Sequence, residues 1–362
     1  MNIKRIETYA TKLVTLVTVV SEDGACGWGQ TSTYNADITA SVLHRQVAPH
    51  ALGKPEDDFD GLCTRTIHRN LKFPWSYVCR ALTGVETAMW DLKGKREEKS
   101  VCRLMGGSKE TVPVYGSSMR RDITPKDEVE RLSRLRHEKG FRAFKVRAGA
   151  EVGEDADQWP GRTKELAAAM RNAFPDDVCL LIDGNSAYTP SKAIAVGTML
   201  QDNGFCHFEE PCPYWELEWT AEVAAALGMD VAGGEQDNDL AQWKRMIGMH
   251  AVDIVQPDVC YIGGITRTLE VARMAADRNM RCIPHSANLS MVTLFTIHVL
   301  GAIPNAGPYL EYSIEPAPWT REFYNPVPEV HDGVVDVPEG PGWGVDISKD
   351  WLQNTQFQAS DL

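Results

Sequence analysis

Residues 179–183 spell Cys-Leu-Leu-Ile-Asp, a short apolar run that ends in a carboxylate. The same pattern returns as Cys-His-Phe-Glu-Glu at 206–210 and as Asp-Val-Ala-Gly-Gly-Glu at 230–235. An amphipathic stretch follows each run, which predicts a buried strand followed by a helix. Working outward in both directions gives eight such strand candidates, at 112–116, 143–147, 179–183, 206–210, 230–235, 254–258, 281–285 and 309–312.

Eight β-then-α units predict an α/β protein with a (β/α) barrel whose last helix is missing or replaced. An open doubly wound sheet is the alternative, but such sheets usually carry a Gly-rich phosphate turn after their first strand. The chain has Ser-Ser-Met-Arg-Arg after Gly116, which is not a turn of that kind.

The segments on either side of the barrel predict two further parts. In the N-terminal segment, strand candidates come first and helical stretches follow them without alternation. This order is typical of an α+β domain. The strands are expected at 3–9, 13–20 and 27–32, and the helices at 36–47, 55–69 and 78–104. The end of the chain is rich in Pro and Gly and is expected to pack back over the first domain. The expected parts are an α+β cap at 1–110, the barrel with the active site at 111–321, and a C-terminal segment at 322–362.

Length and composition narrow the classes of function. The chain has 362 residues, more than the roughly 250–300 at which a single core stops growing, so more than one domain is expected. Its formal net charge is −13 and no run is rich in Lys or Arg, which argues against nucleic acid and anionic membranes as partners. No apolar run reaches the roughly 18 residues of a membrane span. Nine cysteines without a Cys-x-x-Cys pair argue against a disulfide framework or a structural zinc, so a cytoplasmic location is expected.

Polar and ionisable side chains stand at the ends of successive strand candidates. They recur about once per β/α unit, and in a closed barrel such positions converge at the carboxyl-terminal mouth. In chain order they are Lys145 and Arg147, Asp183 and Asn185, Glu209 and Glu210, Glu235, Asp258, His285, and Glu311.

Three of these carboxylates predict a metal site. Asp183, Glu209 and Glu235 end three neighbouring strand candidates, and buried carboxylates must be paired or bound to a cation. Three oxygen ligands without a His or Cys among them suit Mg²⁺ and suit zinc poorly. A lone carboxylate is more often solvated or a helix cap, so the prediction depends on the three being in phase.

The remaining groups predict proton chemistry. His285 follows one strand, and Asp258 ends the preceding one, where it is placed to accept from one ring nitrogen and make the other more basic. Lys145 and Arg147 alternate around Val146, so both are expected inside the barrel, where a neighbouring cation would lower the pKa of the lysine. The set is typical of proton abstraction next to a carboxylate, with the cations stabilising the anion that forms.

Taken together, the motifs resemble the mandelate racemase and muconate lactonizing enzyme branch of the enolase superfamily, whose sites use a Lys or His base with Mg²⁺. The motifs are Asp23-Gly-Ala-Cys-Gly-Trp-Gly29, Trp90-Asp-Leu-Lys-Gly-Lys95, Phe144-Lys-Val-Arg147, Asp183-Gly-Asn185, Glu209-Glu-Pro211, Gly233-Gly-Glu235, Gln256-Pro-Asp258 and Pro284-His285. The resemblance implies a modified TIM barrel with a capping domain formed from both chain termini. It also implies Mg²⁺ at the three carboxylates, a dyad of His285 and Asp258, and Glu311 as an electrophile that binds the substrate carboxylate, with Glu315 close by as a competing position.

Departures from the family pattern indicate the reaction. Arg147 stands where the racemases usually carry a second lysine, and an arginine stays protonated, so a two-base racemase is less favoured. Tyr9 runs almost directly into Leu13, and this short loop resembles the galactonate-dehydratase-like branch, although that branch has a second histidine where Asn185 stands. The expected function is therefore a Mg²⁺-dependent dehydratase of an aldonate or aldarate. His285 would abstract the proton next to the carboxylate through an enediolate, and elimination of the β-hydroxyl would give a 2-keto-3-deoxy acid.

Two other functions stay open at this point. One is racemisation, epimerisation or cycloisomerisation of a carboxylic acid by Lys145 against His285, and the other is a barrel that binds metal without catalysis. Asn185 and Gln236 are expected to contact the substrate, and a small-molecule sugar acid is the expected partner. Relatives that resemble this chain often assemble as symmetric dimers or octamers, so a homo-oligomer is also expected.

Overall fold

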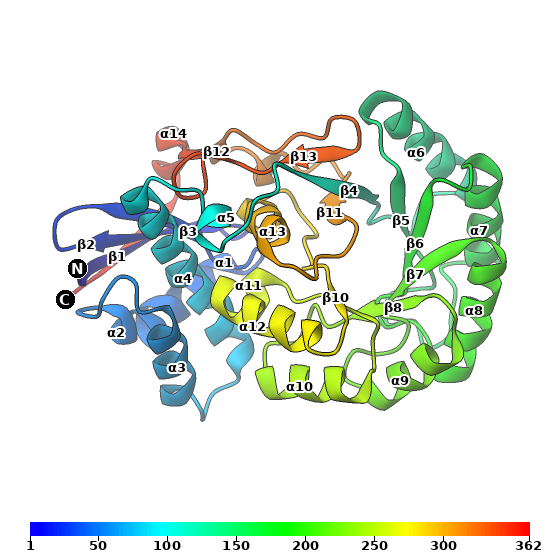
Figure 1. Cartoon of the computed structure of the whole chain (residues 1–362), viewed down its shortest axis with the longest axis horizontal. Coiled ribbons are helices and arrows are strands. Elements are labelled where there is room, and N and C mark those ends of the chain that lie inside the picture. Colours follow the sequence, from blue (N-terminus) through cyan, green and yellow to red (C-terminus); the bar gives the residue numbers. More distant parts are fainter.

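A barrel of parallel strands forms the larger part of the structure, a computed structural model that describes all 362 residues (Figure 1). Its eight strands pair in the order β10-β9-β8-β7-β6-β5-β4-β11, and every pair in this path is parallel. They are β4 (Thr111–Ser117), β5 (Ala143–Arg147), β6 (Cys179–Asp183), β7 (Phe205–Glu209), β8 (Asp230–Gly233), β9 (Ile254–Val255), β10 (Arg281–Cys282) and β11 (Leu310–Ser313). All eight predicted strands are therefore confirmed, and a bridge between Cys282 and Ala306 takes the place of direct pairing between β10 and β11.

Helices follow seven of the eight strands, and most of them cover the outside of the barrel. They are α6 (Pro125–Lys139), α7 (Arg162–Ala173), α8 (Pro190–Asp202), α9 (Leu217–Ala226), α10 (Leu240–Met249), α12 (Ile265–Ala276) and α13 (Met291–Ala302), with a short α11 (Val259–Ile262) before α12. No long helix follows β11, which confirms the expected loss of the last one. Eleven of the twelve α13 residues are buried, because this helix lies between the cap and the barrel (Figure 1).

The cap is built from both ends of the chain, as expected. Its antiparallel sheet has the order β15-β1-β2-β3, so the last strand pairs with the first and the two termini lie side by side (Figure 1). The strands are β1 (Ile3–Ala10), β2 (Thr15–Ser21), β3 (Cys26–Gln30) and β15 (Gln356–Asp361). Its helical elements are α1 (Ala36–Val42), a π-helical turn η1 (Leu43–Val47), α2 (Ala48–Ala51), α3 (Phe59–Arg69), α4 (Trp75–Glu97) and α5 (Val101–Leu104).

Two predictions about element extent were incomplete. The helix expected at 78–104 is two helices, because Glu98 adopts a left-handed conformation with φ of 52° and ends α4. The C-terminal segment packs on the cap through β15, but its strand β13 (Val334–Asp336) also pairs antiparallel with the barrel strand β4. A short 3₁₀ turn, η2 (Pro318–Thr320), precedes this segment, and its remaining elements are β12 (Tyr324–Asn325), β14 (Asp346–Ile347) and α14 (Lys349–Leu352). The boundaries 1–110, 111–321 and 322–362 stay a proposal about domains.

The cap is fixed to the barrel by a buried carboxylate on α4. Glu86 accepts hydrogen bonds from the backbone N–H of Ile265 at 2.9 Å and of Thr266 at 2.7 Å, so it caps the free amides at the start of α12. Gly264 precedes that start with φ of 109°, and a Cβ there would lie 2.3 Å from a Glu86 oxygen. Only glycine fits this contact, which keeps α4 close to the loop that leaves β9.

Asp91 on α4 joins three parts of the chain and gives a stability prediction. Its carboxylate accepts from the Trp28 N–H at 2.7 Å and from the Trp343 N–H at 2.9 Å, and it is 3% exposed. Asp91→Ala leaves these amides unpaired and should lower the free energy of unfolding by about 2–4 kcal/mol, measured by urea denaturation. Lys93→Ala, which removes only the exposed pair with Glu97 on the same helix, should cost less than about 1 kcal/mol. Equal losses for both variants would contradict this role of Asp91.

One pair of cysteines is joined, although the sequence argued against a framework of disulfides. Cys179 on β6 and Cys206 on β7 are joined by a disulfide, with Cα atoms 6.7 Å apart, while the other seven cysteines are free. The two strands are neighbours in the barrel, and the spacing along the chain gave no sign of that pairing. None of the helices combines the length and the apolar character needed to cross a membrane.

Candidate active site

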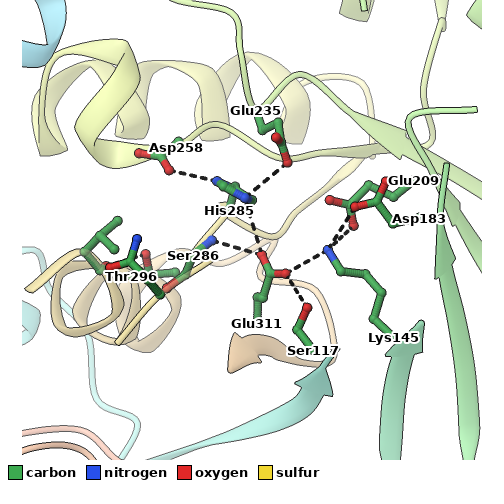
Figure 2. Close-up of polar contacts among 12 residues, drawn as sticks. Ser117, Lys145, Asp183, Glu209, Glu235, Asp258, His285, Ser286, Thr296 and Glu311 are labelled. Carbon is green, nitrogen blue, oxygen red and sulfur yellow. Dashed lines mark hydrogen bonds and ion pairs between the residues drawn. The ribbon is translucent and has the colours of Figure 1, made fainter. Parts of the chain in front are cut away.

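The predicted side chains meet at the carboxyl-terminal ends of the barrel strands (Figure 2). Lys145 on β5, Asp183 on β6 and Glu209 on β7 come from neighbouring strands, and Glu311 comes from β11, which only β4 separates from β5. All four are buried. Lys145 therefore points into the barrel, as predicted.

Lys145 lies at the centre of the carboxylates. Its Nζ is 2.6 Å from Glu209 Oε2, 2.8 Å from Glu311 Oε1 and 3.8 Å from Asp183 Oδ2. Burial alone would lower the pKa of Lys145, but Glu209 and Glu311 outweigh it and raise the pKa. In this arrangement the carboxylates act on Lys145 more strongly than Arg147 does, and the lowering expected beside a carboxylate–metal cluster stays a prediction.

Arg147 and Asn185 hold Asp183. The Arg147 guanidinium pairs with Asp183 Oδ2 and donates to Asn185 Oδ1 at 2.9 Å. The Asn185 backbone N–H donates to Asp183 Oδ1 at 2.7 Å, and its side-chain amide donates to Oδ2 at 3.1 Å. Arg121 also donates to Asn185 Oδ1 at 2.8 Å. In the structure Asn185 thus supports a carboxylate, and its predicted contact with substrate stays untested.

His285 and Asp258 form the predicted dyad. The Nδ1 of His285 lies 2.8 Å from Asp258 Oδ2, which leaves Nε2 facing the carboxylates (Figure 2). The other Asp258 oxygen accepts from the Cys260 N–H at 2.7 Å and from the Tyr261 N–H at 3.1 Å at the start of α11. A carboxylate held in this way fixes the orientation of the imidazole ring.

Glu235 lies next to the free nitrogen of the dyad. Its Oε2 is 3.1 Å from His285 Nε2, and its Oε1 accepts from the Gln236 side chain at 2.9 Å. Burial alone would lower the pKa of His285, but Glu235, Asp258 and Glu311 raise it to about 10. These carboxylates therefore favour the protonated imidazole, and a cation bound to Glu235 would weaken that preference; the Gln236 side chain orients Glu235.

Glu311 is held by three donors. Ser117 donates to Oε1 at 2.7 Å, the Ser286 backbone N–H donates to Oε2 at 3.1 Å, and Lys145 pairs with Oε1. Burial alone would raise the pKa of Glu311, but Lys145 and His285 lower it to about 2. Glu315, the competing position, instead pairs with Arg131 at 3.0 Å. The pair with Lys145 therefore favours the ionised form of Glu311. An ionised carboxylate repels a substrate carboxylate, so the expected role of Glu311 as an electrophile would need a proton or a cation between the two groups.

The carboxylates fit a hard divalent ion by their chemistry. Asp183, Glu209 and Glu235 come from three neighbouring strands, and Glu209 Oε1 is buried without a hydrogen-bond partner. As the structure stands, no three His, Cys, Asp or Glu side chains are arranged to hold a metal ion. Each of the three carboxylates is instead paired with one of the cations described above. Metal binding would therefore exchange these ion pairs for bonds to the ion.

Some contributors to the site escaped the sequence prediction. Ser117 lies one residue beyond the expected end of its strand, although alternation from Tyr115 would have placed it inside the barrel. Ser286 contributes through its backbone, which no residue pattern reveals. Glu210 was noted without a role; it is buried with one unpartnered oxygen, and burial together with Glu235 and Glu209 raises its pKa well above the usual range.

Family models match most of the chain. The model described as enolase C-terminal domain-like matches residues 127–351. The model of the mandelate racemase / muconate lactonizing enzyme N-terminal domain matches residues 4–106. The two matches correspond to the barrel and to the cap.

Two curated relatives act on sugar acids or their lactones by name. The chain is 32% identical over 293 residues to D-galactarolactone cycloisomerase of Agrobacterium fabrum, covering 78% of this chain and 74% of the relative. It is 28% identical over 339 residues to arabinonate dehydratase of Saccharolobus solfataricus, covering 91% of this chain and 87% of the relative.

Two solved structures share the whole fold. A Roseobacter denitrificans protein named provisionally as a racemase is 57% identical with a TM-score of 0.98, and the match covers 100% of both chains. A mandelate racemase/muconate lactonizing protein from Paracoccus denitrificans, crystallised with magnesium, is 26% identical with a TM-score of 0.91, covering 99% of this chain and 98% of that one.

Proposed function

This chain belongs to the mandelate racemase / muconate lactonizing enzyme family of the enolase superfamily, and from that premise we propose that it is a Mg²⁺-dependent dehydratase of a sugar acid. The proposed substrate is an aldonate or aldarate, and the proposed product is a 2-keto-3-deoxy acid. A cytoplasmic location and a symmetric homo-oligomer stay predictions of the sequence.

The dyad of His285 and Asp258 is the observation that carries the proposal. One imidazole is held at 2.8 Å by a fixed carboxylate and presents its other nitrogen to the site. The position that supplies a second base in the family's racemases is Arg147, which is paired with Asp183. Acid–base chemistry from one side supports elimination, since inversion of a stereocentre needs proton transfer on both faces.

We assign the metal ligands to Asp183, Glu209 and Glu235. Their oxygen donors suit Mg²⁺, and the Paracoccus denitrificans relative was crystallised with magnesium. A bound Mg²⁺ would supply positive charge that stabilises the anion formed when the proton next to the substrate carboxylate leaves.

The chain's own groups would then act in order. His285 Nε2 takes the proton next to the carboxylate, and Asp258 stabilises the imidazolium that results. Lys145 adds positive charge beside the developing anion from a buried position, where its effect is larger than in water. The protonated His285 delivers its proton to the departing β-hydroxyl, and the enol product becomes the keto acid.

A screen of aldonates and aldarates tests the proposal directly. With Mg²⁺ present, at least one acid should give a keto acid, detected as its semicarbazone, and chelation of the metal should stop the reaction. Keto-acid formation that survives complete chelation, or its absence from every acid together with a different reaction on one of them, would contradict the proposal.

Cycloisomerisation is the second candidate, because the match to D-galactarolactone cycloisomerase is 32% identical. Incubation in D₂O separates the two. Proton NMR of a dehydratase reaction should show loss of water and deuterium in the 3-deoxy position of the product. Exchange of the proton next to the carboxylate without loss of water would favour a racemase or epimerase, and opening of a lactone would favour the cycloisomerase.

A further inference from the structure

We propose that Arg80 of the cap binds the distal carboxylate of a six-carbon diacid, so that the substrate is an aldarate and not an aldonate. This inference rests on the proposed function and narrows it to one class of sugar acid.

Arg80 lies where the cap meets the active site. It stands near the start of α4, and its guanidinium carbon is 3.4 Å from the centre of the Tyr261 ring. Tyr261 is part of α11 directly after Asp258, and its ring centre is 6.1 Å from that of His285. The two distances place the guanidinium within about 10 Å of the imidazole. Thr83 fixes this arrangement by donating to the Val259 carbonyl at 3.1 Å.

The guanidinium of Arg80 is available to an anion. The guanidinium lies over the Tyr261 ring and also acts on the Tyr261 hydroxyl, which leaves its other N–H groups for a contact with an anion. The other cations near the site are engaged, since Lys145 and Arg147 pair with carboxylates and Arg121 donates to Asn185. Arg80 is half-buried and pairs with no carboxylate of the chain. A dianionic substrate needs such a cation in a protein whose net charge is −13.

The length of a six-carbon diacid matches the distance. A reacting carbon lies roughly 3–3.5 Å from the group that takes its proton. The distal carboxylate carbon of a six-carbon acid is four C–C bonds further, or roughly 5 Å. These lengths add up to roughly 8–8.5 Å, which fits within the limit of about 10 Å between the His285 imidazole and the Arg80 guanidinium. The corresponding aldonate presents a hydroxymethyl group there, which makes no charge-assisted pair with arginine.

Matched acids that differ only at the sixth carbon test this assignment. The probes are galactarate with galactonate, glucarate with gluconate, and mannarate with mannonate, each with Mg²⁺. The wild type should prefer one aldarate over its aldonate by at least about tenfold in kcat/KM. Arg80→Met should lower kcat/KM for that aldarate by roughly 100-fold and change the aldonate less than about threefold. Arg80→Lys keeps the charge and should recover part of the loss.

A control and a binding measurement separate the possible failures. Arg69→Met removes the same charge from an exposed position on α3 and should change neither acid. Equal losses on both acids in Arg80→Met, or a wild type that prefers the aldonate, would overturn the role of Arg80 and leave the dehydratase standing. If no acid gives a keto acid, the proposed function fails. Calorimetric titration of the same diacids then decides on Arg80: at least tenfold weaker binding to Arg80→Met supports it, and a smaller change overturns it.

Discussion

Replacing His285 by asparagine should lower kcat for keto-acid formation by between about 100-fold and 10,000-fold, the range that general acid–base catalysis supplies. Asparagine keeps a polar group of similar size beside Asp258, so the loss reports proton transfer and not a collapsed site. Mg²⁺ should still bind, because the three proposed ligands remain. The measurements are steady-state kinetics on the best acid of the screen and calorimetric titration with Mg²⁺.

The chain offers a matched control for this variant. His331 forms a pair with Asp336 at 3.0 Å on the surface, far more exposed than the dyad in the barrel. His331→Asn should leave kcat unchanged, while Asp258→Asn should lower it toward the level of the His285 variant, because the imidazole loses the partner that fixes its tautomer. A His285→Asn enzyme with wild-type turnover would remove the dyad from the mechanism.

Glu209→Gln should weaken Mg²⁺ binding strongly and abolish activity. The substitution removes a hard anionic ligand, and it also takes away the carboxylate that holds Lys145 at 2.6 Å. The affinity for Mg²⁺ should fall by at least about 100-fold, and keto-acid formation should fall below detection at the Mg²⁺ concentration that saturates the wild type. Glu315→Gln makes the same substitution at a glutamate bound by Arg131, and its Mg²⁺ affinity should stay within about threefold of the wild type. Equal Mg²⁺ affinity in Glu209→Gln and the wild type would exclude Glu209 as a ligand.

The fold could be predicted because its signal is periodic. Most of the predicted barrel strands are short apolar runs that end at or next to a polar side chain, and eight such runs follow one another along the chain. The break in the long cap helix was not predictable, since it depends on Glu98 adopting a left-handed conformation. The pairing of β13 with β4 joins residues more than two hundred positions apart, so only the assembled barrel reveals it.

The sequence could predict which side chains of each strand point into the barrel. Lys145, Asp183 and Glu209 point inward because alternate residues of a strand share one face. The balance of charges could not be predicted, because the pKa of Lys145 depends on Glu311, which lies far along the chain on β11 and comes close only when β11 pairs with β4. The same limit applies to the three proposed metal ligands: the sequence indicated that their side chains converge, but not that each would also face a cation.

Diffraction from crystals grown with Mn²⁺, which replaces Mg²⁺ and scatters anomalously, tests the central claim most directly. The account predicts one strong anomalous peak within about 2.0–2.3 Å of an oxygen of each of Asp183, Glu209 and Glu235. The side chains of Lys145 and Arg147 should have moved off the oxygens that bind the ion. A saturated crystal with no peak between these three carboxylates, or with its only peak elsewhere, would contradict the account.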